Sequence, residues 1–271
     1  MNIQSLGYRT DLFFARFGGE VQDRGHYVVI RTPSNPTYYC GNFLLFARPP
    51  GEGDFEAWLR LFAEEIGTPP TTEHIRFGWD TTTEEVGQVT PFLDAGFDLE
   101  RNVVLTTREI HRPPKYNMEV VVRPLQAKEE WQGALDNQVA CREEGHALDT
   151  YITFKTRQMA QYRAMTHAGL GEWFGAFLDG RLVADLGVFV ERGVGRYQAV
   201  GTHPDFRRRG ICGALVHQAG QYAFERLGAE TLVMVADEAY HAARIYESVG
   251  FQPTERQFSL CRWPRVERAE E

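Results

Sequence analysis

The sequence has few cysteines and no long apolar run, and both features narrow the class of protein. Cys40, Cys141, Cys212 and Cys261 lie far apart and form no C-x-x-C pair. This spacing indicates neither a disulfide framework nor a zinc site, and it fits a reducing compartment. No apolar run approaches the ~20 residues that a membrane helix needs. Residues 1–5 lack a charged segment followed by an apolar one, so we expect no signal peptide and a cytoplasmic protein.

An excess of positive charge is also missing. The formal net charge of −8 argues against a protein that coats nucleic acid, and it weakly favours a cationic small substrate. We expect no nucleic-acid partner, no membrane partner and no metal. With 43% hydrophobic residues in 271, the chain can bury a core as one large domain or two ordinary ones.

The first 110 residues predict a small α/β domain. Turn formers separate β-rich runs, and Asp54 precedes apolar residues at helical spacing, as a helix cap does. The expected helices are 8–17, 54–66 and 82–95, and the expected strands are 26–32, 39–47, 74–79 and 103–107. Residues 111–116 contain Pro113 and Pro114, which prevent regular pairing, so this segment is the predicted linker.

The second domain, residues 117–271, predicts a mixed sheet flanked by helices. Asp179-Gly180 has the composition of a two-residue hairpin turn between its second and third strands. The expected strands are 118–123, 173–178, 182–190, 196–200, 231–235 and 251–261, and the expected helices are 126–145, 152–168, 211–227 and 240–249.

Residues 197–214 are the most informative stretch. A short strand leads through Gly201 and Pro204 to three arginines, and a long amphipathic helix follows. The first N–H groups of a helix lack internal partners and carry partial positive charge, so a strand, a glycine-containing turn and a helix form an anion site. We expect Gly210 and Gly213 to let a phosphate approach the backbone, with Arg207, Arg208 and Arg209 adding positive charge.

Two motifs in this half resemble the GNAT acetyltransferase superfamily. The acetyl-CoA signature of that family is Arg or Gln, two residues, Gly, one residue, then Gly or Ala. Arg207 and Gly210 match it, while Cys212 departs from it. The order of expected elements in residues 117–262 also matches the family core.

The second motif places Tyr246 four residues before Gly250-Phe251, and it resembles the end of the family core. The family often carries an Asn seven residues before this Tyr, where this chain has Ala239. A core aromatic is the alternative interpretation of Tyr246.

The resemblance implies acetyl-CoA as co-substrate and direct attack of an amine on its thioester. It assigns the pyrophosphate to backbone groups around Arg208–Gly213, including Ile211 and Cys212. It assigns the pantetheine arm to Val200, Gly201 and Thr202. The Val200 amide would polarise the acetyl carbonyl, and Tyr246 would protonate the leaving thiolate. A helix N-terminus beside arginines also predicts a lowered pKa for the Cys212 thiol.

The general base is left open by the sequence. Some family members carry a Glu where this chain has Arg196, so the obvious base is missing. The remaining candidates are His203, Glu191, Asp185 and a water relay through Tyr197. His203 stands beside a proline in the turn, which favours a structural role.

The first half contains an incomplete copy of both motifs. Residues 92–97 parallel 246–251, with Phe92 in place of the tyrosine, and residues 48–53 satisfy the signature spacing. Pro49 and Pro50 lack N–H donors, and Glu52 and Asp54 would repel a phosphate. We therefore predict tandem GNAT folds: a degenerate domain at 1–110 that binds no acetyl-CoA, and a catalytic domain at 117–271. An unrelated α/β domain is the alternative.

These observations predict an acetyl-CoA-dependent N-acetyltransferase of α/β fold that acts on a small-molecule amine, as a monomer or homodimer. The alternative is a non-catalytic acyl-CoA-binding or sensing module, because Arg196 and Ala239 replace residues that are usual in the family.

Overall fold

The computed structural model describes residues 1–142, 147–239 and 243–264, and its contacts group the chain into two compact units. Unit 1 spans Met1–Val103 together with the C-terminal segment from Glu255, and unit 2 spans Val104–Thr254. The strands β5 (Asp98–Thr107) and β11 (Gln252–Arg262) each begin in one unit and end in the other. The contacts therefore divide the chain at other positions than the predicted linker, and the tandem origin of the two halves stays a prediction.

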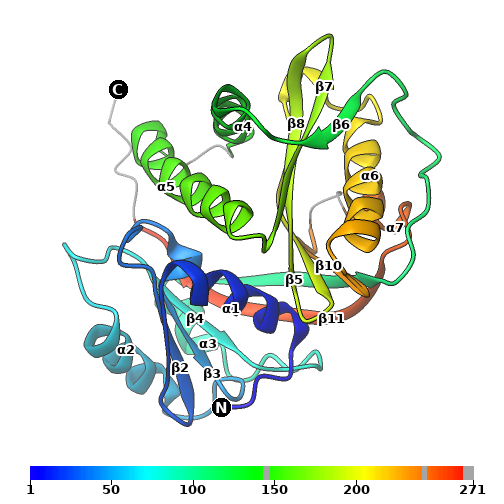
Figure 1. The fold of residues 1–271 in the computed structure, drawn as a ribbon. Helices are drawn as coiled ribbons and strands as arrows, with labels where there is room; N and C mark the ends of the chain where they lie inside the picture. Colours follow the sequence, from blue (N-terminus) through cyan, green and yellow to red (C-terminus); the bar gives the residue numbers. More distant parts are fainter. Residues whose placement is uncertain (143–146, 240–242, 265–271) are drawn as a thin grey trace. The chain divides into compact units, whose positions relative to one another are not determined.

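Unit 1 is a mixed sheet with helices packed on it. Its strands follow the order β1-β2-β3-β4-β11; the pair β3/β4 is parallel and the other pairs are antiparallel. Its elements, labelled in Figure 1, are α1 (Leu6–Gly18), β1 (Glu20–Asp23), β2 (Tyr27–Arg31), β3 (Phe43–Phe46), α2 (Asp54–Glu65), β4 (Ile75–Trp79) and α3 (Thr90–Asp94).

Successive side chains along the strands of unit 1 pack on opposite faces of the sheet, so this unit has two hydrophobic cores. Val28 and Ile30 of β2 join Leu12 of α1 in one cluster, whereas Val29 joins Trp58 of α2 in the other. Successive side chains of a strand point to opposite faces, so a run that is apolar throughout needs a cover on both sides.

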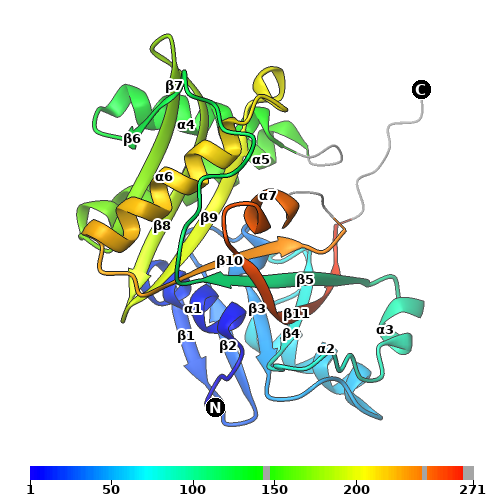
Figure 2. The same ribbon diagram turned by 90° about the vertical axis from the view of Figure 1, so that its right-hand side faces the viewer.

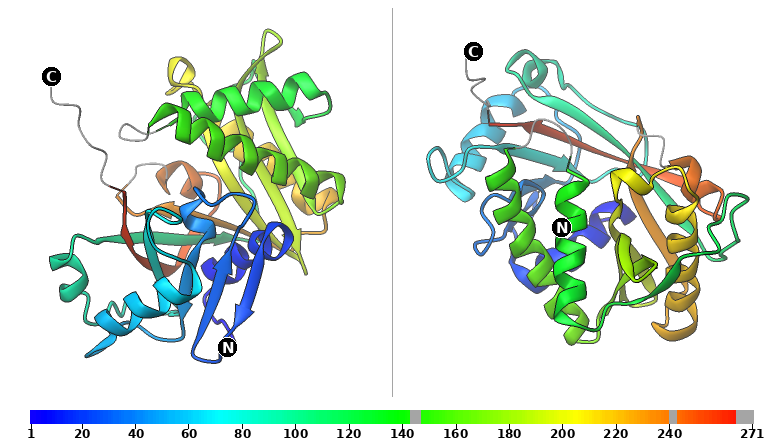
Figure 3. Two further views of the ribbon diagram at one scale, coloured as in Figure 1. Left: turned by 90° about the vertical axis from the view of Figure 1, so that its left-hand side faces the viewer. Right: turned by 90° about the horizontal axis from the view of Figure 1, so that it is seen from above.

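Unit 2 contains the strand order β10-β9-β8-β7-β6, in which only β9 and β10 run parallel. Figures 1, 2 and 3 show α4 and α5 on one face of these strands and α6 along the other. The elements are β6 (Val121–Pro124), α4 (Lys128–Ala140), α5 (Leu148–His167), β7 (Gly171–Leu178), β8 (Arg181–Glu191), β9 (Val194–Thr202), α6 (Ile211–Arg226), β10 (Thr231–Asp237) and α7 (Ala243–Glu247).

The core of unit 2 is aromatic on both faces of β7. Trp173 stacks on Tyr162 of α5, with ring centroids 4.9 Å apart. The next residue, Phe174, meets Tyr222 of α6 at 5.3 Å. Adjacent residues of one strand thus attach both helical layers to the sheet.

Most predicted elements agree with the structure, including the Asp179-Gly180 turn, where both residues have positive φ. The helix predicted over 82–95 is wrong, because only Thr90–Asp94 is helical. Thr83 N donates to the Thr81 hydroxyl and Glu85 N to the Thr83 hydroxyl, and such local bonds compete with helix formation. Residues 39–41 form a 3₁₀ turn rather than the start of a strand, and β1 was not predicted.

Two further details concern helix ends and length. Gly53, not Asp54, is the N-cap of α2, because Asp54 is already the first helical residue; the φ of Gly53 is left-handed at 77°. The predicted helix 240–249 begins outside the described residues, and its described part is α7. Within the described part of the chain, no helix combines the length and the apolar character needed to cross a membrane.

Candidate functional site

The candidate site of unit 2 begins where β9 and β10 separate. These parallel strands pair only over Val194–Arg196 with Thr231–Val233, although β9 continues to Thr202. Beyond Arg196, the edge of β9 that faces β10 is therefore outside this ladder. An open edge between two parallel strands offers backbone donors and acceptors to an extended ligand.

A bulge in β9 lies at this open edge. Asp185 of β8 faces Gly201 and Gly187 faces Gln198, so the two residues Ala199 and Val200 stand opposite a single residue of β8. Ala199 has a φ of 45°, a conformation that non-glycine residues rarely adopt. Bulges re-aim backbone groups, and strain of this kind gathers at functional positions.

The turn after β9 has the geometry of an anion site. Arg208 and Gly210 both have positive φ, at 63° and 75°. The first main-chain bond into α6 runs from Ala214 N to Gly210 O at 3.2 Å. The N–H groups of Ile211, Cys212 and Gly213 precede it, and an α-helix leaves such groups without internal acceptors. Positive φ beside helical residues turns successive N–H groups toward one concave point.

The three arginines of the turn have different surroundings. Arg207 Nε donates to Thr202 O at 3.2 Å and so ties the turn to the end of β9. Arg209 lies 3.9 Å from the Glu119 carboxylate, while Arg208 is exposed. Arg207 is thus a positional residue of the turn, and Arg208 and Arg209 supply accessible charge.

The glycines of the turn also serve packing, which the sequence did not indicate. A Cβ on Gly210 would stand 3.1 Å from Lys115 O and from Asn117 N, and a Cβ on Gly213 would stand 2.9 Å from Pro113 Cγ. Asn117 also donates to Gly210 O and to Arg209 O. The predicted linker therefore lies along the start of α6 and fixes the turn.

The predicted lowering of the Cys212 pKa is wrong. Burial raises the pKa of this thiol to about 12, because desolvation outweighs the helix N-terminus and the nearby arginines. A thiol that stays protonated at neutral pH acts as a small packed side chain.

Tyr246 lies on α7 and is buried at 6% exposure. Gly250, with a φ of 116°, ends this segment, and Phe251 N donates to Tyr246 O at 3.2 Å. The rings of Tyr246 and Phe251 meet edge to face at 6.5 Å. Gly250 thus ends the helical segment, as predicted, and Phe251 packs against the tyrosine ring.

The residues considered as the general base lie in different environments. His203 Nδ1 accepts from Asp205 N and caps the 3₁₀ turn Pro204–Phe206, which supports its structural role. Glu191 pairs with Val194 at the far hairpin end of β9, roughly 20 Å of strand from Val200.

Tyr197 and Asp185 are both buried. The Tyr197 hydroxyl donates to Val216 O of α6 at 2.8 Å, and burial raises its pKa, so it is committed to packing α6. Asp185 is 0% exposed, lies opposite Gly201, and is enclosed by three side-chain donors. Arg196, in the position of the missing Glu, is also buried.

Unit 1 closes the matching turn with its own side chains. Its parallel strands β3 and β4 pair up to Phe46 and Trp79, and Asp80 N adds a bond to Phe46 O at 2.8 Å. At the start of α2, the Asp54 carboxylate accepts from Gly51 N at 2.7 Å and from Arg48 Nη1 at 2.6 Å. The groups that could bind a phosphate already hold a carboxylate of the protein.

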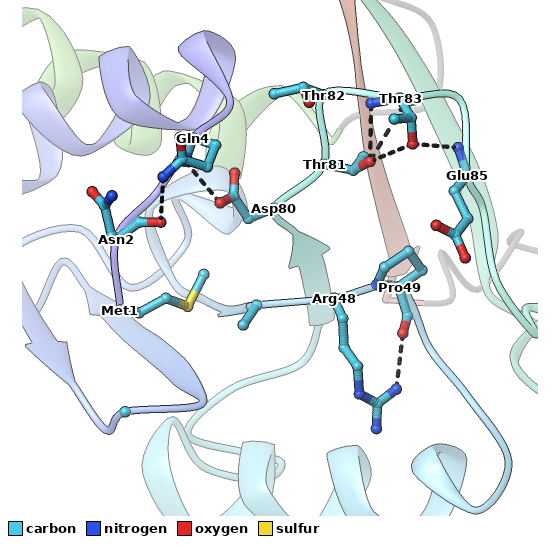
Figure 4. Close-up of a pocket in the computed structure, with 12 residues that line it drawn as sticks. Met1, Asn2, Gln4, Arg48, Pro49, Asp80, Thr81, Thr82, Thr83 and Glu85 are labelled. Carbon is cyan, nitrogen blue, oxygen red and sulfur yellow. Dashed lines mark hydrogen bonds between the residues drawn. The ribbon is translucent and has the colours of Figure 1, made fainter.

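A pocket of about 590 Å³ lies beside this closed turn, at the carboxyl ends of β3 and β4 (Figure 4). The Asp80 carboxylate in it accepts from Gln4 N and Ser5 N, both at 2.8 Å. Figure 4 shows the Arg48 guanidinium turned toward the carbonyl of Pro49 and away from the threonines. The pocket therefore offers no free cation for a pyrophosphate.

Solved structures first define the fold class. The chain is 18% identical to the GCN5-related N-acetyltransferase from Kribbella flavida, with a TM-score of 0.65 and coverage of 98% of both chains. A functionally unknown conserved protein from Staphylococcus epidermidis gives a TM-score of 0.68 at 13% identity, covering 92% of this chain and 95% of that one. A tandem GNAT protein from the clavulanic acid biosynthesis pathway gives 0.54 at 12% identity, covering 95% and 88%. This is the GNAT acetyltransferase fold.

The sequence of unit 2 is also similar to this family. Residues 136–251 match the model of the acetyltransferase (GNAT) family. Transfer of an acetyl group from an acyl-CoA is the general chemistry of that family. A comparison with curated proteins found no match.

Proposed function

We propose that unit 2 transfers the acetyl group of acetyl-CoA to the amine of a small molecule. The first turn of α6, with Arg208 and Arg209, binds the pyrophosphate. The open edge of β9 at Val200–Thr202 pairs with the pantetheine arm. The amine attacks the thioester carbon, the C–S bond breaks, and the thiolate leaves.

Two groups assist this reaction. The Val200 N–H donates to the carbonyl oxygen, whose negative charge grows as the amine attacks. The Tyr246 hydroxyl gives its proton to the departing thiolate and regains one from solvent, to which the amine has released its own proton. In this proposal Asp185, Tyr197 and Glu191 do not accept that proton directly, because the first two are buried and the third is distant.

The separation of β9 from β10 carries the proposal. The strands part after Arg196, the bulge at Ala199 and Val200 follows, and the anion turn begins a few residues later. One extended ligand with a phosphate end and a thioester end fits this sequence of features along a single strand.

We also propose that residues 1–110 are a degenerate GNAT domain that binds no acetyl-CoA. The Asp54 carboxylate at the start of α2 and the full pairing of β3 with β4 support this. The net charge of −8 supports a small cationic acceptor rather than nucleic acid or a membrane. In this proposal the protein is a cytoplasmic monomer or homodimer.

Two measurements test the function. Calorimetric titration of acetyl-CoA should show one site per chain, and thiol release with a panel of amines should identify the acceptor class. Tight binding without turnover on any amine would establish the non-catalytic sensing module instead. Absence of binding would overturn both.

A further inference from the structure

One buried carboxylate of unit 2 has no part in the steps above. Asp185 is 0% exposed in the middle of β8. Its Oδ1 accepts from Asn137 Nδ2 at 2.5 Å, and its Oδ2 accepts from Gln138 Nε2 at 3.0 Å and from Trp173 Nε1 at 2.8 Å. Removing a carboxylate from water is unfavourable unless neighbours replace the lost hydrogen bonds, so three aimed donors mark a specific arrangement.

The two amides on α4 also reach the bulge of β9. Gln138 Nε2 donates to Ala199 O at 2.6 Å, and Asn137 Nδ2 donates to Gly201 O at 3.3 Å. These carbonyls belong to the residues on either side of Val200. Gly201 permits the approach, because a Cβ there would lie 3.1 Å from Gln138 Nε2.

We propose that Asp185 is a positioning residue for the acetyl transfer. Through Asn137 and Gln138 it fixes the bulge around Val200, so that the Val200 N–H points at the acetyl carbonyl. The inference rests on the proposed function and deepens it. Bulges have few ladder bonds of their own, so the orientation of this one depends on the side chains that hold its carbonyls.

The network is complete only when Asp185 is ionised, since a protonated carboxyl loses one acceptor site. Burial raises its pKa to about 7, although the three donors and the charge of Lys155 on α5 act in the opposite direction. Cys141, which follows α4, is the other titratable neighbour, and burial raises its pKa as well. The strands β7 and β9 contribute uncharged groups, Trp173 and Gly201.

The main test is Asp185→Asn, measured on the full chain with acetyl-CoA and an accepted amine. We expect kcat to fall about 10- to 100-fold, as for a misplaced catalytic group, with the Kd of acetyl-CoA within about threefold of wild type. The wild-type kcat should rise with pH through about 7, and this step should vanish in the variant. The control Asn42→Ser removes a buried amide of unit 1 that bonds Thr32 N, and it should lower Tm without lowering kcat.

A second variant separates positioning from folding. Asn137→Asp combined with Asp185→Asn exchanges the carboxylate and the amide, which preserves their mutual hydrogen bond but leaves Gly201 O without its donor. We expect this protein to regain the Tm lost in the single variant and to stay slow in kcat. If the exchange restores kcat together with Tm, the role of Asp185 is structural and the inference is overturned.

A binding measurement keeps the two proposals distinguishable. In ¹⁵N-labelled protein the Val200 amide resonance should shift more with acetyl-CoA than with CoA, and Asp185→Asn should abolish that difference. A wild type that binds no acetyl-CoA overturns the proposed function and the inference with it. A wild type that binds and transfers, beside an Asp185→Asn variant with the same kcat and amide shift, overturns the inference alone.

Discussion

The chain contains two turns with the same spacing of arginine and glycine, and only one of them leaves its backbone donors free. In unit 2 the turn at 207–213 follows a strand that has parted from its parallel neighbour. In unit 1 the turn at 48–53 follows a strand that stays paired to its end. The Asp54 carboxylate then satisfies the unit 1 turn from within. Motif spacing is therefore insufficient, because in unit 1 the Gly51 amide and the Arg48 guanidinium are both bonded to Asp54.

The largest expected difference between the units concerns Tyr246 and Phe92, each of which stands four positions before the glycine of a Gly-Phe pair. Tyr246→Phe should lower kcat by about 1,000-fold, because the thiolate loses its proton donor, and should leave acetyl-CoA binding unchanged. The matched control is Phe92→Tyr, which places a hydroxyl in the fully buried core of unit 1 and should lower Tm only. Steady-state thiol release measures kcat. Unchanged turnover in Tyr246→Phe would remove the proposed role of this residue.

Charge reversal compares the two turns directly. Arg208→Glu with Arg209→Glu should weaken acetyl-CoA binding about 100-fold, since charge-assisted bonds to phosphate are lost. Arg48→Glu in unit 1 should change the Kd less than threefold, because Arg48 is paired with Asp54. Calorimetry measures both. Equal weakening by the two changes would show that the unit 1 turn also binds the ligand.

The units should also respond to pH in opposite directions. Burial lowers the pKa of His74 in unit 1 to about 4 from 6.5, so the unfolded chain binds the extra proton between these values and unit 1 gains stability as pH rises. Burial raises the pKa of Asp185 in unit 2 to about 7 from 3.8, so the native state binds the proton there and unit 2 loses stability as pH rises toward 7.

Each effect should be about 3 to 4 kcal/mol across its full pH window. Hydrogen exchange of amides in β2 and β8, corrected for the intrinsic pH dependence, reports the two units separately. His74→Gln should flatten the first slope and Asp185→Asn the second. Parallel slopes in β2 and β8 would contradict the assignment of these groups.

The smallest expected effect comes from the two glycines that cap the helices after the turns. Gly210→Ala and Gly53→Ala both place a side chain at a φ near 75°, at a cost of about 1 kcal/mol in stability. Only Gly210→Ala should also weaken acetyl-CoA binding, by about 10-fold, because its Cβ meets the segment at 115–117 and shifts the turn. Weaker acetyl-CoA binding in Gly53→Ala would show that the unit 1 turn also contributes to binding.

Local patterns predicted much of this fold. The helical spacing of Phe55, Trp58 and Phe62 and the turn Asp179-Gly180 appear in the structure as expected. The failures were local competitions, as in the threonine turns before α3, where side chains replace helical bonds. The C-terminal strand illustrates a different limit: β11 pairs with β4 of unit 1, and no local pattern encodes such a distant partner.

The sequence by itself determined most elements of unit 2, the glycine-containing turn at Arg207–Gly213 and the placement of Tyr246 before Gly250-Phe251. These features depend on residues that are close together in the chain. A 3.6-residue apolar period predicts a helix there, and a glycine permits a positive φ. Only the tertiary structure decided that β9 parts from β10, that Ala199 bulges, and that Asp185 meets the amides of α4. It also half-buried Cys212 at the start of α6, and this desolvation raised a pKa that the sequence predicted to be low. Desolvation and strand register are set by what packs around a residue, and that information is not local.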